Sequence, residues 1–312
     1  MITGWGKCRP PVSLTNADLE RLVDTSDEWI VTRTGIRERG IAHVECTDLA
    51  ELAARRALAA AGHDPDAAGD ALDLICVATT TPESLCPSTA VEIQRRLGAT
   101  GTAAFDTNAA CSGFVYALAT VASLVETGVA RRALVVGAER LSYLMDYHER
   151  STCVLFGDGA GAVVLEGVDT PDDAPRPGVL GVDLGADGSR SHLIAFGGIG
   201  TRGTIDRHDP ADFSVQFAGQ AVFKIAVEGM AASARRALER AGLGPDDVDV
   251  FVPHQANRRI IDAAARRLGL DPERVVVDIE THGNTAAASV PMALTDALAA
   301  GRIAPGDVVV TS

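Results

Sequence analysis

Three side chains of this sequence stand where they could carry out thiol chemistry. Cys111 follows an apolar run and opens an uncharged helix, where unpaired backbone N–H groups are expected to lower the pKa of a thiol. His254 ends the run DVFVP, at the kind of strand end where α/β sheets place their sites. Asn284 precedes a second uncharged helix. Together they form the pattern of a nucleophile beside an imidazole and an amide that donates to an oxyanion.

Each of these residues also has a plain structural explanation. A lone cysteine is usually buried and inert, which is how we interpret Cys76 and Cys153. A histidine at a strand end can be a satisfied core residue, and an asparagine before a helix is commonly its N-cap. The functional reading therefore depends on whether the fold brings the three side chains together.

Composition narrows the class of protein. The chain has 312 residues, with 28 basic and 42 acidic side chains and a net charge of -14. This charge argues against a nucleic-acid partner. The six cysteines include no Cys-x-x-Cys pair, so we expect no metal, and the N-terminus has no apolar signal region. We interpret the uncharged run from Thr107 to Val125 as a buried helix, not a membrane span, and expect a cytoplasmic protein with reduced thiols.

Apolar, β-rich runs alternate with alanine-rich helical patterns, which predicts an α/β fold. The predicted strands are Leu72–Ala78, Ala103–Asp106, Ala133–Ala138, Gly161–Leu165, Val248–Pro253, Val275–Ile279 and Val308–Thr311. The predicted helices are Asp48–Ala61, Ser88–Leu97, Gly113–Thr127, Phe217–Ala241, Asn257–Leu268 and Thr285–Ala300.

The order of these elements repeats across a linker rich in Asp and Pro, Val168–Gly178. Each side gives strand, helix, strand, loop, uncharged helix and strand, which predicts two similar halves, residues 1–167 and 178–312. The uncharged helices, Ser112–Val125 and Thr285–Thr295, should be covered on all sides between two sheets. The first half carries one strand more, so we expect the second sheet to lack its last strand.

Five segments give the chain a specific resemblance that covers nearly its whole length. They are SDEWIVTRTGIRER (26–39), DTNAACSGFVYAL (106–118), FGDGAGAVVL (156–165), VFVPHQANRRI (250–260) and GNTAAASVP (283–291). In order and spacing they resemble the β-ketoacyl-acyl-carrier-protein synthase III family of thiolase-like condensing enzymes. The resemblance implies a five-layer αβαβα fold, in agreement with the repeat.

The resemblance also implies a reaction. Cys111 would take an acyl group from acyl-CoA, and His254 and Asn284 would bind the malonyl thioester of acyl carrier protein. Decarboxylation would give an enolate that attacks the acyl-cysteine and forms a 3-oxoacyl product. A CoA thioester is then a substrate, and no cofactor is expected. Relatives of this family continue past the final VVVTS with a Gly-rich loop and strand that complete the oxyanion hole.

Several residues would contact CoA. From the sequence itself, Thr25–Glu28 is a predicted capping box, and Trp29 and Arg33 share one face of the helix that follows. A surface cation–π pair explains that spacing equally well. The resemblance implies that Trp29 and Arg150 sandwich the adenine, that Thr25 and Arg33 touch the nucleotide, and that Asn257 meets the pantetheine arm. Gln220 stands where some relatives place Asn for the same contact.

Other positions concern the remaining partners. Four basic residues are predicted to dock the acidic carrier protein: Lys224, Arg259, Arg266 and Arg267. A solvated basic face is the ordinary alternative. Cys86 replaces a residue that in relatives reaches across a homodimer to limit acyl length, which predicts a roomier acyl pocket.

Two other functions remain open at this stage. One is an acyltransferase or starter-unit enzyme of natural-product assembly, and the other is a non-catalytic partner subunit of a condensing enzyme. The Gly-rich segment 198–203 matches a dinucleotide-binding pattern but lacks the helix that should follow, so we interpret it as a loop of the active site. The segment 157–162 is predicted to be a tight turn before a strand.

Overall fold

The computed structural model describes residues 1–169, 177–196 and 215–312 of the chain. Its strands are β1 (Ile2–Cys8), β2 (Val12–Thr15), β3 (Glu38–Ile41), β4 (Leu74–Ala78), β5 (Ala103–Thr107), β6 (Arg132–Glu139), β7 (Gly159–Glu166), β8 (Ile194–Phe196), β9 (Val215–Phe217), β10 (Val250–Val252) and β11 (Val309–Thr311). Its helices are α1 (Asn16–Leu19), α2 (Asp27–Thr34), α3 (Cys46–Ala60), α4 (Thr89–Arg96), α5 (Gly113–Glu126), α6 (Arg150–Cys153), α7 (Gly219–Arg240), α8 (Arg258–Leu268), α9 (Ile279–His282) and α10 (Ser289–Ala299).

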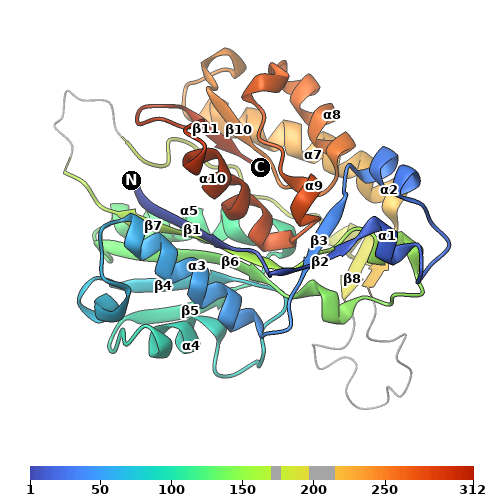
Figure 1. Ribbon diagram of the computed structural model, residues 1–312. Coiled ribbons are helices and arrows are strands. Elements are labelled where there is room, and N and C mark those ends of the chain that lie inside the picture. Colours follow the sequence, from blue (N-terminus) through green and yellow to red (C-terminus); the bar gives the residue numbers. More distant parts are fainter. Residues whose placement is uncertain (170–176, 197–214) are drawn as a thin grey trace.

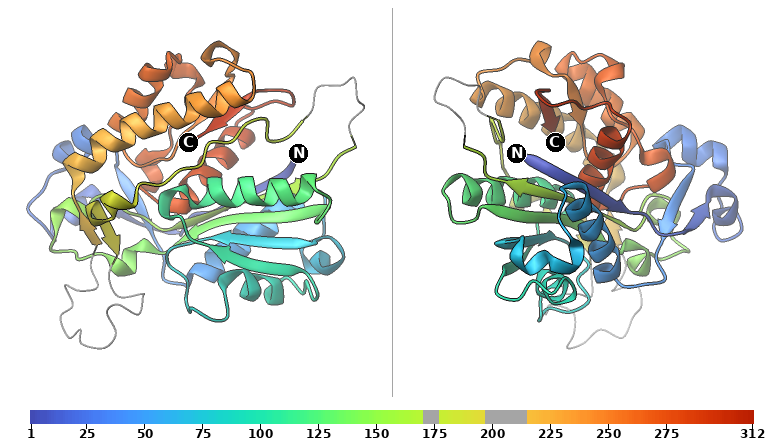
Figure 2. Two further views of the ribbon diagram at one scale, coloured as in Figure 1. Left: turned by 180° about the vertical axis from the view of Figure 1, so that it is seen from behind. Right: turned by 60° about the vertical axis from the view of Figure 1, so that its left-hand side comes forward.

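The elements stack in five layers, as predicted (Figure 1). Helices α3 and α4 cover one face of a sheet with the order β1-β7-β6-β4-β5. Helices α5 and α10 cover its other face, and the small parallel sheet β10-β11 follows. Figure 2 shows α7 and α8 as the outermost layer on that side. Because α10 packs on β1 and β7, the two sequence halves interlock in the central layer.

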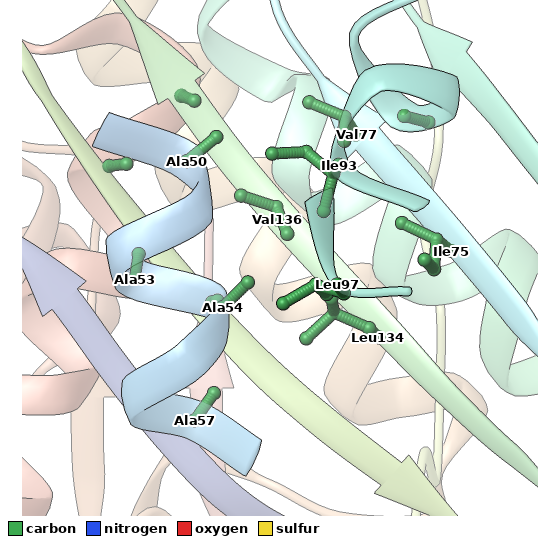
Figure 3. Packing of buried hydrophobic residues seen from close by; sticks show 14 of the residues in the cluster. Ala50, Ala53, Ala54, Ala57, Ile75, Val77, Ile93, Leu97, Leu134 and Val136 are labelled. Carbon is green, nitrogen blue, oxygen red and sulfur yellow. The ribbon is translucent and has the colours of Figure 1, made fainter. Parts of the chain in front are cut away.

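Alanines on α3 let this helix lie very close to the sheet (Figure 3). Ala50, Ala53, Ala54 and Ala57 are fully buried in one core cluster with Val136 and its neighbours. On β1, a Cβ at Gly4 or Gly6 would overlap backbone atoms of α3. Glycine is unusual inside a strand, so β1 was not predicted from the sequence.

The two central helices differ in how far they are covered. Along α10 nearly every residue is buried, because both sheets contact it. A Cβ on Gly161 of β7 would come 2.6 Å from the backbone of Pro291 and Met292. The glycines of the segment 157–162 therefore allow α10 to pass close over β7. The prediction that this segment is a tight turn is wrong, since β7 begins within it.

The prediction that the first uncharged helix is covered all round is wrong for the single chain. On α5, Thr120 and Ser123 are exposed. Their hydroxyls donate to the carbonyl oxygens of Tyr116 and Ala119, four residues earlier. Hydroxyls satisfied in this way make a helix face polar without any charge, which the charge pattern alone did not reveal.

The predicted strand Val275–Ile279 is also wrong. Val275 forms an isolated parallel bridge to Phe251, but Ile279 begins α9. Here the side chain of Gln255 takes the place of a neighbouring strand. Its Nε2 donates to the carbonyl of Val276, and its Oε1 accepts from the amide of Asp278. The other predicted strands and helices form, with ends shifted by up to four residues. The Gly-rich segment 198–203 and most of the linker lie outside the described residues.

Candidate active site

Cys111 lies in a short 3-10 turn, η2 (Ala110–Ser112), between the end of β5 and the start of α5. Ala110 adopts a φ of 48°, the left-handed region that L-residues rarely occupy. The amide of Ala110 donates to Oδ1 of Asn108 at 3.2 Å, which stabilises this bend. A strained backbone at the sharp turn from strand to helix holds the partly buried thiol at the helix start.

The prediction of a lowered thiol pKa is wrong for this structure. Burial raises the pKa of Cys111 to about 12, and the nearby carboxylate of Glu139 acts in the same direction. The backbone amide at Cys111 opposes them, but the helix start does not outweigh the loss of water around a thiolate. The free protein therefore carries a neutral thiol at this position.

His254 follows β10, and among the described residues its ring has one close hydrogen-bond partner. Its Nδ1 lies 2.5 Å from the hydroxyl oxygen of Ser289, the first residue of α10. That oxygen also accepts from the amide of Gln255 at 3.4 Å, so its own hydrogen is available to donate to Nδ1. The proton of the neutral ring then sits on Nε2. Burial lowers the pKa of His254 to about 4, which keeps the ring neutral at neutral pH.

Asn284 is 7% exposed and its backbone is held on both sides. Its amide donates to the carbonyl of Leu155, and its carbonyl accepts from the amide of Gly157. Its side-chain Oδ1 accepts from the amide of Ala286 at 2.9 Å, as in a capping turn. This bond leaves the side-chain Nδ2 as a donor, and among the described residues it has no acceptor within hydrogen-bond reach.

The three predicted residues converge on one structural neighbour, the 3-10 turn η9 (Ala286–Ala288). This turn follows Asn284 directly, and Ser289, the partner of His254, comes next in the chain. On the other side η9 contacts η2, the turn of Cys111. A Cβ on Gly113 would come 3.4 Å from the Cβ of Ala287. The fold thus brings the segments that carry all three residues together at η9.

A cleft of about 720 Å³ opens beside the turn of Cys111. Its walls include Thr79, Ser84, Leu85, Asp106 and Ala110, from the end of β4, the loop before α4 and the end of β5. Cys86 is exposed and lies between two residues that line this cleft. Cys86 itself does not line the cleft.

The predicted adenine-binding residues lie together at α2. The guanidinium carbons of Arg33 and Arg150 each lie 4.8 Å from the centroid of the Trp29 ring. Arg150 is further fixed through a 2.7 Å hydrogen bond to the carbonyl of Asp24. Trp29 thus has two cationic neighbours, one of them from a segment more than a hundred residues away.

The other predicted CoA contacts have different surroundings. The N-cap of α2 is Ser26 and the predicted capping box at Thr25 does not form, because Oγ of Ser26 takes the amide of Trp29. The hydroxyl of Thr25 is buried without a hydrogen-bond partner among the described residues. Asn257 caps α8 and donates to the carbonyl of Arg33 at 2.9 Å. Gln220 is exposed near the start of α7.

The four residues predicted to dock a carrier protein form one exposed basic face, which we call the α7/α8 face. It consists of Lys224, Arg259, Arg266 and Arg267. Helices α7 and α8 pack side by side, and Arg259 covers the ring of Phe223 at 5.4 Å. Arg258 is not part of this face, because it pairs with Asp262.

One cluster has the composition of a metal site. Asp278, His282 and Asp296 place ligand atoms within 4.8 Å of one another. The ammonium of Lys7 lies 2.6 Å from Asp296 and 3.0 Å from Nε2 of His282, so a side-chain cation already compensates the carboxylate charge. We interpret the cluster as a support for α9, which leads into Asn284.

Two residues of the site escaped the sequence reading, Glu139 and Ser289. Glu139 ends β6 and is fully buried beside the turn of Cys111. The signal was present, because a single acidic residue ends the otherwise apolar run ALVVGAE. Ser289 gave no such signal, since a serine that opens an uncharged helix is an ordinary residue there.

The chain is similar in sequence to proteins of one known family. Two models match: "3-Oxoacyl-[acyl-carrier-protein (ACP)] synthase III" at residues 105–188, and the C-terminal model of the same family at residues 238–312. Among curated relatives, β-ketoacyl-[acyl-carrier-protein] synthase III of Erythrobacter litoralis is 48% identical over 99% of this chain and 93% of that protein. The corresponding protein of Rhizobium meliloti is 49% identical with the same two coverages.

Solved structures agree with these matches. The 3-oxoacyl-[acyl-carrier-protein] synthase III of Aquifex aeolicus superposes with a TM-score of 0.89 at 44% identity, covering 99% of this chain and 94% of that one. A priming β-ketosynthase from the R1128 polyketide pathway gives a TM-score of 0.88 at 38% identity, covering 99% and 90%. In the described part of the chain, no helix is long and apolar enough to cross a membrane.

Proposed function

Because this chain belongs to the 3-oxoacyl-[acyl-carrier-protein] synthase III family, we propose that it condenses an acyl-CoA starter with malonyl-acyl carrier protein. The product is a 3-oxoacyl-acyl carrier protein, which initiates fatty acid synthesis. The observation that carries the proposal is the convergence of Cys111, His254 and Asn284 around η9. The reaction needs no cofactor, since the CoA thioester is itself a substrate.

In the first step Cys111 takes the acyl group. Its sulfur attacks the thioester carbonyl, the bond to the CoA sulfur breaks, and the thiol proton leaves with CoA. The thiol is neutral at rest, so its deprotonation has to accompany the attack. The start of α5 lies at this sulfur, and its N–H dipoles stabilise the charge that develops there.

In the second step the malonyl group loses carbon dioxide. The electron pair of the broken bond becomes an enolate, whose oxygen accepts from Nε2–H of His254 and Nδ2–H of Asn284. Both donors are neutral, and neither has to reorganise, because Ser289 and the amide of Ala286 already hold them. The enolate carbon then attacks the acyl-cysteine carbonyl, the carbon–sulfur bond breaks, and Cys111 leaves as a thiolate that takes up a proton from water.

The remaining residues bind the two carriers. Trp29, with Arg33 and Arg150, offers an aromatic and cationic surface for the adenine and phosphates of CoA. The α7/α8 face offers positive charge to the acidic carrier protein against the overall charge of -14. Thr25 lies four residues before Trp29 in the chain, and Asn257 donates to the carbonyl of Arg33. Both positions support their assignment to CoA.

We further propose that the chain acts as a homodimer in the cytoplasm. In the described residues β5 pairs only with β4, which leaves its other edge open. Beside that edge Leu85 is 72% exposed. An open edge beside an apolar side chain is suited to pair with a second copy. Cys86 would then lie at the acyl pocket between the two copies.

Two measurements test the proposed function. Mass spectrometry after incubation with acyl-CoA should show one added acyl group on the peptide that contains Cys111, and Cys111→Ala should show none. The same variant should still release carbon dioxide from malonyl-acyl carrier protein, because the enolate-stabilising donors remain. An acyl adduct on the Ala variant would contradict the nucleophile, and a wild-type protein without any adduct would fit a non-catalytic partner subunit.

The structure of the R1128 priming ketosynthase supports a second candidate, the priming of a polyketide pathway. The chemistry at Cys111 would be the same, and only the starter acyl group and the carrier would differ. A panel of acyl-CoA starters with fatty acid and polyketide carriers separates the two. A simple acyltransferase would transfer the acyl group without releasing carbon dioxide.

A further inference from the structure

The buried carboxylate of Glu139 lies directly behind the proposed active site. Glu139 is the last residue of β6 and is 0% exposed. Its carboxylate accepts from the Thr80 amide at 3.1 Å, the Thr80 hydroxyl at 2.9 Å and the Thr81 hydroxyl at 2.6 Å. Ala287 lies near this strand end, because a Cβ on Gly137 would overlap the carbonyl oxygen of Ala287. Buried carboxylates with this many donors are held in one position.

These donors come from the segment after β4, on which the turn of Cys111 rests. A Cβ on Gly113, two residues after Cys111, would come 3.2 Å from the Cβ of Ala78 at the end of β4 and 3.4 Å from that of Ala287 in η9. Glu139 bonds to the residues that follow Ala78, and its strand β6 packs on η9. Glu139 therefore connects the segments that align the nucleophile with the turn of Asn284.

The charge of Glu139 also acts on the thiol of Cys111. The titratable groups that face Glu139 in the described structure are Cys46 of α3, Tyr143 and Cys111. None of them is a cation, so no neighbour among these neutralises the carboxylate. Burial raises the pKa of Glu139 to about 7, and the group is charged in the alkaline range where thiols ionise. A charge there opposes a thiolate at Cys111.

We propose that Glu139 is a positioning residue for the condensation. Its carboxylate holds the segment after β4, which packs with η9 around the turn of Cys111, and its charge adds to the burial that opposes a thiolate there. This inference rests on the proposed function. It explains why a costly buried carboxylate stands at this strand end, since an apolar residue would leave the donors of Thr80 and Thr81 unsatisfied.

The test compares Glu139→Gln and Glu139→Asp with Glu166→Gln as the matched control. Glu166 ends β7 at the opposite end of the same strand pair, where it bonds to Arg132. Alkylation by iodoacetamide is followed against pH on the peptide that contains Cys111. For Glu139→Gln we expect a midpoint about one pH unit lower, which is about tenfold faster alkylation below that midpoint. Glu139→Asp keeps the charge and should keep the wild-type midpoint.

Steady-state condensation supplies the second readout. Both Glu139 variants should lower kcat about tenfold or more with KM for acyl-CoA nearly unchanged, and Glu166→Gln should match the wild type. A Glu139→Gln profile that coincides with the wild type, or an unchanged kcat in either variant, overturns the inference. Should Glu139→Gln fail to fold, an unchanged kcat of Glu139→Asp remains decisive. A wild-type protein that takes up no acyl group would instead refute the proposed function.

Discussion

Nδ1 of His254 lies 2.5 Å from the hydroxyl oxygen of Ser289, a contact that joins the end of β10 to the start of α10. This one hydrogen bond orients the imidazole and places its proton on Nε2, the atom that the proposed enolate needs. It also links the histidine to the helix that follows Asn284, so the two proposed donors share one support.

Ser289→Ala should therefore impair decarboxylation more than acyl transfer. Without the hydroxyl, Nδ1 loses its donor and the ring can take the other tautomer or rotate. We expect the release of carbon dioxide from malonyl-acyl carrier protein to fall about tenfold, and acylation of Cys111 to change less than twofold. Ser123→Ala on the exposed face of α5 is the control and should change neither rate. Equal losses in both steps would contradict this role.

The lowered pKa of His254 predicts a pH dependence of stability. An unfolded histidine binds a proton below about pH 6.5, while the folded ring stays neutral down to about 4. Protons then favour the unfolded chain, so this group lowers stability as the pH falls through that window. From about pH 7.5 to about pH 5.5 the wild type should lose about 1 kcal/mol relative to His254→Asn. Urea unfolding of both proteins at the two pH values measures the difference, and parallel curves would refute it.

Gly137 predicts a steric test of the site. A Cβ at this position on β6 would overlap the carbonyl oxygen of Ala287 in η9. Gly137→Ala should lower the free energy of unfolding by about 1–3 kcal/mol and reduce condensation, because η9 has to move. Gly229→Ala is the control, since nothing lies within 4 Å of its added Cβ in α7. That variant should be slightly more stable, and a Gly137→Ala protein with wild-type stability would contradict the packing.

The α7/α8 face predicts selective loss of carrier binding. Reversing charge with Arg266→Glu and Arg267→Glu should raise KM for malonyl-acyl carrier protein about tenfold and leave KM for acyl-CoA nearly unchanged. The effect should shrink at high salt, because exposed charges are screened. Arg131→Glu, an exposed arginine outside this face, serves as the control. Equal changes in both KM values would point to a general fault in folding.

Much of this architecture could be predicted from periodicity. Most predicted elements were correct, because buried strands and alanine-rich helices carry strong local patterns. The repeat predicted a helical layer between two sheets, whereas the full five-layer arrangement was implied by the family resemblance. The strand β1 was missed since Gly4 and Gly6 serve a close helix contact that has no local signature. The failure at Val275–Ile279 has another cause, a side chain from Gln255 that takes over backbone hydrogen bonds.

The sequence predicted that Cys111, His254 and Asn284 converge, and in the structure the segments that carry them meet at η9. Their catalytic roles stay a prediction. The expected lowering of the thiol pKa was wrong, because local reasoning sees the helix start but not the burial or the carboxylate of Glu139. Both depend on segments that are distant in the sequence.

The cleft beside the turn of Cys111 is lined in part by the exposed loop that carries Ser84 and Leu85. Asn284 and η9 do not line this cleft and are buried against β6, β7 and α10. Substitutions in that loop can therefore reshape the space for a starter chain without disturbing the reacting groups. Changes in this loop would therefore alter which starter acyl group the protein accepts, while the reaction itself would stay the same.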